Sequence, residues 1–228
     1  MLLDILIPTY NRVEPLKKNL ILLIDYINRL ECKDNVCIIV SDNCSSDSTF
    51  NELNILKSNT DIKVIIYKQE ENIGQEKNTV FTLSKSSAKY SMLLGDDDFL
   101  QFEYFKKVIE SLYSGELTCI IPSFIAKKVD GGIVGYRGLG ENKKYAKGFS
   151  SVLDLAILGH QLSGLVFLRE GTLKTYLSNE KYRNMYLFIF FVGFNCFRGN
   201  TLCLTEYPLD RTTRTKKESH PLCFGSFW

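Results

Sequence analysis

Short apolar runs alternate with amphipathic stretches along the first half of the chain. Continuous apolar runs, which are typical of strands buried on both faces, cover residues 3–7, 36–40, 62–67 and 90–94. Between them we expect helices over residues 16–27, 47–57 and 75–87. This alternation predicts an α/β fold with a parallel sheet and helices on both of its faces.

The second half of the chain changes character. We expect strands at residues 118–124, 163–168 and 201–205, a short helix at 150–158 and further helical segments to about residue 198. A glycine-rich stretch at residues 131–140 predicts a hairpin or a loop. Because no repeat, low-complexity segment or linker interrupts the sequence, we expect one domain.

Polar residues follow each predicted strand of the first half. These segments are residues 8–12, 41–47, 68–74 and 96–98. In a doubly wound sheet, ligands bind beyond the carboxyl ends of the strands. The sequence therefore places its candidate site at that edge.

Composition narrows the function classes. The chain has 228 residues, 45% of them hydrophobic, and its 28 basic residues nearly balance 26 acidic ones. This length is enough for a sizeable core, and the balance argues against a nucleic-acid-binding protein. The motifs G-x-G-x-x-G and G-x-x-x-x-G-K-[ST] are absent from the sequence, which disfavours dinucleotide oxidoreductases and P-loop kinases.

Cysteine usage and the N-terminal residues bear on the compartment. The 7 cysteines are an odd number without a C-x-x-C pair, which argues against a zinc site and for reduced thiols in the cytosol. The first residues, MLLDILIPTYNR, include Asp4 and no basic segment, so we interpret them as a strand rather than a signal peptide. The apolar run at residues 185–197 is too short to span a membrane. We expect a core helix there, with a place at a bilayer surface as the alternative.

Three consecutive carboxylates end the fourth predicted strand. In an extended chain Asp96 and Asp98 point the same way and Asp97 points across. A hard divalent cation such as Mg²⁺ or Mn²⁺ relieves the repulsion between two close carboxylates, because it prefers oxygen ligands. The alternative is an acidic turn that caps a helix beginning near Gln101.

Two further polar loops suggest nucleotide contacts. Asp42 and Asn43 follow the second strand, where such a pair can hydrogen-bond a planar heterocycle, although an Asx-turn is as good an interpretation of Asp42. Asp47 is expected to cap the next helix. Gly74 permits close backbone approach, and Lys77 can reach a diphosphate from the start of a helix.

Four motifs together resemble one enzyme family. They are IPTYNR at residues 7–12, VSDNCSSDS at 40–48, ENIGQEKN at 71–78 and LLGDDD at 93–98. In order and spacing they are similar to the family 2 glycosyltransferases with the GT-A fold, over roughly the first 110 residues. The resemblance implies a Rossmann-like, mostly parallel sheet flanked by helices, with a smaller acceptor-side α+β region. It implies that residues 1–115 bind a nucleotide sugar and that residues 116–228 form the acceptor-binding half of the same domain.

The resemblance also implies an activity and its residues. The activity is inverting transfer of a sugar from a nucleotide-diphosphate donor to a saccharide acceptor in surface polysaccharide synthesis, with Mn²⁺ or Mg²⁺ as cofactor. Asp98 would bind the metal, and Asp96 would bind the ribose or a water of that metal. The implied contacts of the donor are Pro8, Thr9 and Asn11 beside the nucleoside, Asp42 on the base, and Lys77 and Asp97.

The general base is harder to assign. Family members commonly place a Glu-Asp pair a little after a G-x-x-x-x-[RK] strand, which GLVFLR at residues 164–169 resembles, but no such pair follows here. Glu180 is the default candidate, with a solvated turn residue as the alternative. His160 is a candidate neighbour of the acceptor pocket, with a structural role as the alternative. A histidine before the strand and an aromatic helix after it resemble the abequosyltransferase-like branch.

The C-terminal residues leave alternatives open. A basic stretch of Arg211, Arg214, Lys216 and Lys217 is interpreted either as closing over the diphosphate or as a solvated surface run. The chain is short for the family, so either its acceptor region is minimal or its C-terminus is incomplete. Two other functions stay open: a catalytically silent sugar-nucleotide-binding module and a sugar-1-phosphate nucleotidyltransferase.

The expected location is the cytoplasm, at the inner face of the membrane. The implied acceptor is a lipid-linked saccharide, because polysaccharide-building relatives use such acceptors. Residues 186–194, next to Lys181 and Arg183, are the candidate contact with anionic headgroups.

Overall fold

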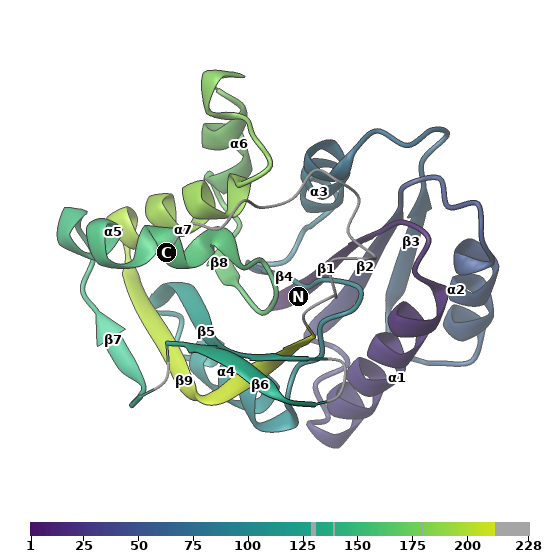
Figure 1. Cartoon of the computed structure of the whole chain (residues 1–228), viewed down its shortest axis with the longest axis horizontal. Helices are drawn as coiled ribbons and strands as arrows, with labels where there is room; N and C mark the ends of the chain where they lie inside the picture. Colours follow the sequence, from purple (N-terminus) through teal and green to yellow (C-terminus); the bar gives the residue numbers. More distant parts are fainter. Residues whose placement is uncertain (129–130, 139, 179, 213–228) are drawn as a thin grey trace.

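The computed structural model describes residues 1–128, 131–138, 140–178 and 180–212, without the side chains of Tyr182 and residues 210–212. These residues form a nine-stranded sheet in the order β3-β2-β1-β4-β8-β5-β9-β7, with β6 paired to β5 (Figure 1). The strands are β1 (Leu3–Thr9), β2 (Val36–Asp42), β3 (Val64–Lys68), β4 (Tyr90–Leu93), β5 (Leu117–Lys127), β6 (Ile133–Arg137), β7 (Lys143–Tyr145), β8 (Val166–Leu168) and β9 (Asn200–Thr212). The helices are α1 (Val13–Arg29), α2 (Thr49–Ser58), α3 (Gln75–Ser84), α4 (Phe102–Tyr113), α5 (Phe149–Leu155), α6 (Thr172–Leu177) and α7 (Leu187–Arg198), with short 3₁₀ segments η1 (Ala156–His160) and η2 (Glu180–Tyr182).

The first four strands form the parallel half of the sheet, as the alternation predicts. β1 pairs in parallel with β2 and β4, and β2 pairs in parallel with β3. Alternate residues of these strands enter two separate hydrophobic clusters: Ile5 packs on the face of α1 and α4, whereas Leu6 packs on the face of α3 and α7. Both faces of the sheet are therefore buried, which explains the continuous apolar runs.

The sheet changes direction after β4. β8 runs antiparallel to β4 and β5 runs antiparallel to β8, whereas β9 is parallel to β5. The glycine-rich segment contributes strand β6, which pairs antiparallel with β5, so of the two alternatives the hairpin is the correct one. The last predicted strand is confirmed, but β9 extends well beyond residues 201–205. The polar edge strand β7 was not predicted, because its sequence carries no apolar signal.

The aromatic segment lies mostly in the core. Leu187, Phe188, Phe191 and Val192 of α7 are buried, and Phe191 packs against Phe167 of β8. These side chains cover the sheet, so they do not form a bilayer-facing surface. In the described residues, no helix has both the length and the apolar character that crossing a membrane requires.

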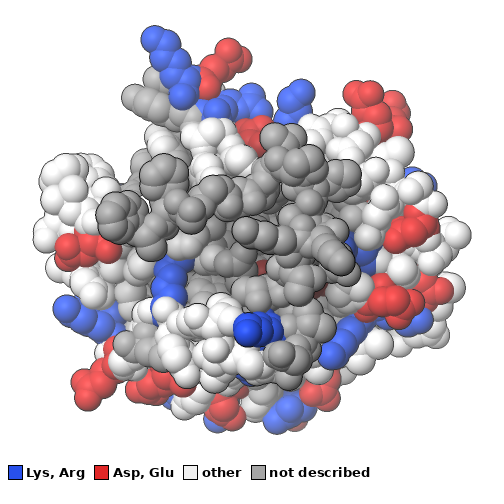
Figure 2. All heavy atoms as spheres, in the orientation of Figure 1, with Lys and Arg blue, Asp and Glu red and all other residues white. Residues whose placement is uncertain are grey.

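On the face shown in Figure 2, charged side chains of both signs are mixed. Figure 2 shows lysine and arginine side chains interspersed with aspartate and glutamate around the rim of one face. This mixture agrees with the near balance of basic and acidic residues in the sequence.

Asp4 is a carboxylate inside an apolar strand, and its partners explain it. Its side chain is 1% exposed. One oxygen accepts hydrogen bonds from the Ser86 hydroxyl at 2.8 Å, the Ser87 N–H at 2.7 Å and the Ala88 N–H at 2.9 Å. Asp4 therefore fixes the turn between α3 and β4, which leads to the acidic residues at the end of β4.

Asp47 fixes the start of α2. Its Oδ1 accepts from the Thr49 N–H at 3.0 Å and from the Thr49 hydroxyl at 2.5 Å. Partial desolvation acts to raise the pKa of Asp47, but these bonds and a bond from the Val13 backbone outweigh it, and the pKa is lowered. Asp47 thus holds the first turns of α1 and α2 together, as an ionised group.

Replacing Asp4 tests the contribution of its three hydrogen bonds to stability. We expect Asp4→Asn to lower the free energy of unfolding by about 1–3 kcal/mol, because buried donors lose a charged acceptor. Urea denaturation measures this value. The control is Asp25→Asn, whose exposed carboxylate pairs with Arg29 at 3.5 Å and should change stability by less than about 0.5 kcal/mol. Equal effects of the two substitutions would contradict the role of Asp4.

Replacing Asp47 tests the pH dependence. Because the folded pKa lies below the unfolded value of about 4, the ionised form stabilises the fold above pH 4, and this contribution is lost as the pH falls through the folded pKa. We expect Asp47→Asn to be less stable than the wild type by about 0.5 kcal/mol at pH 7, since solvent screens this exposed carboxylate, and the deficit to be smaller at pH 3. Urea titrations at both pH values, with the exposed Asp34→Asn as control, measure the difference. A deficit of the same size at both pH values would show that the charge of Asp47 has no role.

Candidate active site

The carboxyl ends of β1, β2 and β4 bring the predicted polar residues to one edge of the sheet. Thr9 lies opposite Asp42 in the parallel register, and the Asn43 N–H donates to the Thr9 carbonyl at 2.9 Å. The Thr9 hydroxyl donates to Oδ2 of Asp96 at 2.7 Å. Segments that are far apart in the sequence therefore meet here, as the sheet topology predicts.

The acidic residues after β4 form a turn and not an extended chain. Asp96 and Asp97 are turn residues, and the Asp98 N–H reaches the Gly95 carbonyl at 3.4 Å. We expected Asp96 and Asp98 to point the same way because we took this segment to be extended. That assumption is wrong, because the segment is a turn. Their positions are set by partners instead: Asp96 binds Thr9, and Asp98 Oδ2 accepts from the Ser163 hydroxyl at 2.5 Å.

Gly95 and Asn19 hold this turn in place. A Cβ at Gly95 would lie 2.9 Å from Oδ2 of Asp98 and 3.0 Å from the Ser163 hydroxyl, so a larger residue would displace the Asp98 carboxylate or the Ser163 side chain. The buried Asn19 amide of α1 donates to the carbonyls of Gly95 at 3.0 Å and Asp98 at 2.9 Å. Sequence reasoning missed Asn19 and Ser163. The signal for Asn19 was a polar residue on the apolar face of a helix.

Asp42 is fully buried and only half satisfied. Its Oδ1 accepts from the Ser45 N–H at 3.1 Å and from the Ser45 hydroxyl. Its Oδ2 has no hydrogen-bond partner among the described parts of the chain. The Asx-turn interpretation accounts for the first oxygen only. A buried carboxylate oxygen without a hydrogen bond is costly, so the second oxygen is a candidate ligand contact.

Asn11 holds the loop that follows β2. Its backbone has a positive φ of 53°, its N–H donates to the Ser45 hydroxyl at 2.8 Å, and its Oδ1 accepts from the Ser46 N–H at 2.8 Å. Pro8, three residues earlier, is half-buried. The role of Asn11 in this structure is to shape the wall of the site, together with Ser45.

The start of α3 is built by three asparagines. Asn72 accepts from the Gly74 N–H at 3.0 Å and from the Asn43 amide at 2.9 Å, and Gly74 adopts a positive φ of 84°. The buried Asn78 exchanges hydrogen bonds with Ser41 at 2.7 and 3.0 Å. Lys77 is exposed in the first turn of α3. The N-x-G motif thus fixes the position from which Lys77 extends.

The two candidate residues of the second half lie on different segments. His160 ends η1, and its ring nitrogens lie 2.8 Å from the guanidinium of Arg137 on β6. Glu180 is exposed at the start of η2, and its backbone carbonyl accepts from the Arg183 N–H at 3.1 Å. Of the basic stretch, the side chain of Arg211 and all of Arg214, Lys216 and Lys217 lie outside the described residues.

The side chains at this edge determine which metal ion they could bind. No group of three or more histidine, cysteine, aspartate or glutamate side chains is placed to hold a metal in the part of the chain that the structure describes. A magnesium-like ion commonly takes one or two carboxylates and completes its shell with substrate phosphates and water. Asp96 and Asp98 fit that arrangement and do not form a metal site by themselves.

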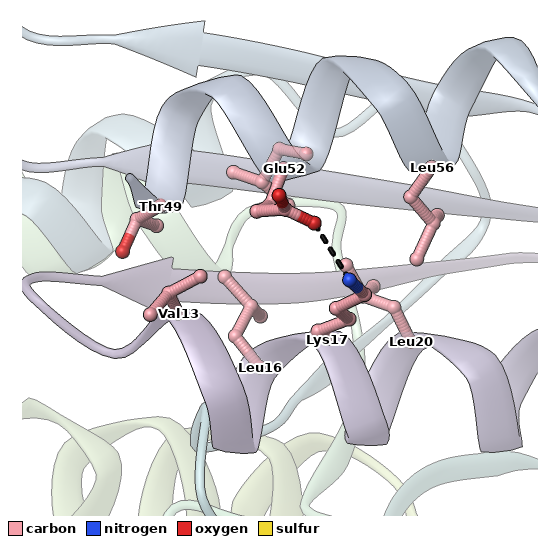
Figure 3. Close-up of a pocket in the computed structure, with 8 residues that line it drawn as sticks. Val13, Leu16, Lys17, Leu20, Thr49, Glu52 and Leu56 are labelled. Carbon is pink, nitrogen blue, oxygen red and sulfur yellow. Dashed lines mark hydrogen bonds and ion pairs between the residues drawn. The ribbon is translucent and has the colours of Figure 1, made fainter. Parts of the chain in front are cut away.

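A small groove between α1 and α2 is a separate feature from the carboxyl edge of the sheet. Figure 3 shows Lys17 and Glu52 joined across it, 2.7 Å apart. Its other lining residues are largely apolar, namely Val13, Leu16, Leu20, Thr49, Leu53 and Leu56. It is a packing groove between two helices.

Solved structures share this fold. A crystal structure of residues 1–349 of S. aureus TarS superposes with a TM-score of 0.70 at 18% identity, over 93% of this chain and 60% of that one. The structure of the same protein in complex with UDP-GlcNAc superposes with a TM-score of 0.70 at 16% identity, over 96% of this chain and 62% of that one. The mannosyltransferase PcManGT from Pyrobaculum calidifontis, in complex with GDP-Man and Mn²⁺, gives 0.51 at 13% identity, over 76% and 46%. The expected GT-A fold is confirmed.

Sequence comparison gives the family. The abequosyltransferase RfbV of Salmonella typhimurium (strain LT2) is 32% identical over 101 residues, which are 44% of this chain and 29% of that protein. This chain thus matches less than a third of the length of that relative. The profile of glycosyl transferase family 2 matches residues 4–170, which include all the carboxyl-edge loops described above and Ser163. The chain therefore belongs to glycosyl transferase family 2.

Proposed function

We propose that this chain transfers a sugar from a nucleotide-diphosphate donor to a saccharide acceptor, with inversion at the anomeric carbon, in the synthesis of a surface polysaccharide. The observation that carries the proposal is the buried Oδ2 of Asp42, which has no hydrogen-bond partner in the described part of the chain and lies at the carboxyl edge that also holds Asp96 and Asp98. The names of the related proteins support it, since they include an abequosyltransferase, a UDP-GlcNAc complex and a mannosyltransferase complex with GDP-Man.

In this proposal the first half of the chain, residues 1–115, binds the donor. Asp42 accepts a hydrogen bond from the base, and Pro8, Thr9 and Asn11 border the nucleoside. Lys77 reaches the diphosphate from the first turn of α3, where the helix dipole also favours an anion. Asp97 completes the donor contacts.

Asp96 and Asp98 would hold Mn²⁺ or Mg²⁺. Such an ion, when bound, neutralises the negative charge that grows on the leaving diphosphate. The contribution of the chain is to fix the two carboxylates beforehand: Thr9 orients Asp96, and Ser163 orients Asp98. This preorganisation avoids a reorganisation cost when the donor binds.

The acceptor side, residues 116–228, supplies the proton acceptor in this proposal. Inversion requires the acceptor hydroxyl to attack the anomeric carbon from the face opposite the diphosphate, and a general base to take its proton. Glu180 is the proposed base, and His160 is the proposed neighbour of the acceptor. The missing Glu-Asp pair favours a second candidate function, a nucleotide-sugar-binding module without catalysis. Family membership disfavours the sugar-1-phosphate nucleotidyltransferase.

The proposed location is the cytoplasm, at the inner membrane face, with a lipid-linked acceptor. The described cysteines are all free, which supports a reducing compartment. They are Cys32, Cys37, Cys44, Cys119, Cys196 and Cys203.

Asp98 provides the test of catalysis. A panel of nucleotide sugars, assayed with Mn²⁺ for release of the sugar, first identifies the preferred donor of the wild type. With that donor, we expect Asp98→Ala to lower kcat by about 10²–10⁴-fold. Its circular dichroism spectrum should stay unchanged. The exposed Asp61→Ala serves as the matched control. A folded Asp98→Ala protein with wild-type turnover would exclude the proposed role, and absence of turnover by the wild type with every donor would favour the binding module.

Asp42 provides the test of donor binding. We expect Asp42→Ala to raise the Kd for the preferred nucleoside diphosphate about 10–100-fold, because a charge-assisted hydrogen bond to the base is lost. Calorimetry with UDP, GDP, CDP and dTDP in the presence of Mn²⁺ measures the Kd. The control is Asp34→Ala, which removes an exposed carboxylate and should change the Kd less than threefold. Unchanged affinity of the Asp42 variant would remove this residue from the base pocket.

A further inference from the structure

A charged fork joins the first turn of α3 to the segment between α6 and α7. The Arg183 Nε donates to Glu76 Oε1 at 3.1 Å, and its Nη2 donates to Oε2 at 3.0 Å. Such bidentate pairing fixes the relative orientation of the two planar groups as well as their distance. The two residues are 107 positions apart in the sequence, so the fork links the two halves of the chain.

Tyr176 closes this fork from α6. Its hydroxyl donates to Glu76 Oε1 at 3.0 Å and accepts from the Asn184 N–H at 3.1 Å. The Tyr176 side chain is fully buried, and its ring packs against Phe190 and Phe191 of α7 at centroid distances of 5.5 and 5.4 Å. Glu76 therefore receives three hydrogen bonds from a segment that is itself anchored in the core.

The fork is better shielded from water than the ion pair between Lys17 and Glu52. The side chains of Arg183 and Glu76 are 30% and 19% exposed, against 46% and 30% for Lys17 and Glu52. Partial shielding and bidentate geometry both strengthen such a pair over an ordinary surface ion pair. The hydrogen bond to Glu76 also raises the pKa of Arg183 above its usual value.

The residues beside the fork are those of the proposed chemistry. Glu76 immediately precedes Lys77, the proposed diphosphate contact. Glu180 and Arg183 belong to one short turn, since the Arg183 N–H donates to the Glu180 carbonyl at 3.1 Å. Figure 1 shows α6 beside α3 at the same end of the molecule, and residues of the two helices are in contact. The fork thus ties the backbone segment that carries Glu180 to the helix turn that carries Lys77.

We propose that Glu76, Arg183 and Tyr176 form a positioning device that locks the α6–α7 connection onto the donor-side helix and sets the distance between the acceptor side and the diphosphate. This inference rests on the proposed function for its effect on turnover. The lock itself is a physical property of the fold. Neither Glu76 nor Arg183 contacts the reacting atoms in this account, and both act through the segment that they hold.

The experiment uses single variants and their charge-reversed pair. We expect Glu76→Gln and Arg183→Met each to lower the kcat of sugar release about 10–100-fold, while the Kd for the nucleoside diphosphate changes less than threefold. The double variant Glu76→Arg with Arg183→Glu restores the pair in reverse and should recover at least tenfold of the lost kcat. Loss of turnover with retained affinity, and its rescue, distinguish positioning from general destabilisation.

The matched control is the ion pair across the groove in Figure 3, which joins two helices of the donor half. Lys17→Met and Glu52→Gln should leave kcat and Kd unchanged. Amide hydrogen exchange provides a readout that does not depend on activity. Residues 172–178 and 180–186 should exchange faster in Glu76→Gln and in Arg183→Met, and at the wild-type rate in the reversed pair.

The outcomes separate this inference from the proposed function. If the wild type releases no sugar, the proposed function fails, and hydrogen exchange alone decides whether the lock exists. If exchange of these residues is unchanged in the single variants, no lock exists and the inference is overturned. It is also overturned if exchange accelerates while an active enzyme keeps its full kcat.

Discussion

The structure depends on holding three consecutive carboxylates, Asp96 to Asp98, at the point where the parallel half of the sheet ends. Adjacent negative charges repel, so an unsupported turn of this kind would open toward solvent. Here a hydroxyl from β1 and a hydroxyl from the loop before β8 each take one carboxylate, while Asn19 holds two carbonyls of the turn from below. The acidic turn is thus fixed between segments from both halves of the chain.

Most polar side chains at this edge of the sheet already have hydrogen-bond partners within the protein. Asn43, Asn72 and Asn78 are engaged with one another, with neighbouring backbone groups or with Ser41. Their hydrogen bonds shape the loops and leave little for a ligand. Asp42 differs, because its Oδ2 is buried and has no partner among the described residues. One unsatisfied oxygen in a well-satisfied wall is a sharper indication of a binding position than any of the motifs alone.

The sequence predicted the parallel half of the fold well and the second half less well. The strands of the first half are continuous apolar runs because both of their faces are covered, and this signal is easy to see. The edge strand β7 reads Lys-Lys-Tyr and is exposed, so hydrophobicity carries no information about it. The positions of the Asp96 and Asp98 side chains could not be predicted from the local sequence either. They depend on a turn and on Ser163, which is 65 residues away from Asp98. Likewise, the partners of Glu76 follow from the packing of α6 beside α3, which no local pattern encodes.

The central claim is that Asp42, Asp96 and Asp98 form one donor site. A crystal structure of the full chain with a nucleoside diphosphate and Mn²⁺ tests it most directly. We expect the base to lie within hydrogen-bond distance of Asp42 Oδ2 and the carboxylate of Asp98 to be a ligand of Mn²⁺. A nucleotide bound elsewhere, or at this edge with Asp42 Oδ2 still unpaired and Mn²⁺ held without Asp98, would contradict it.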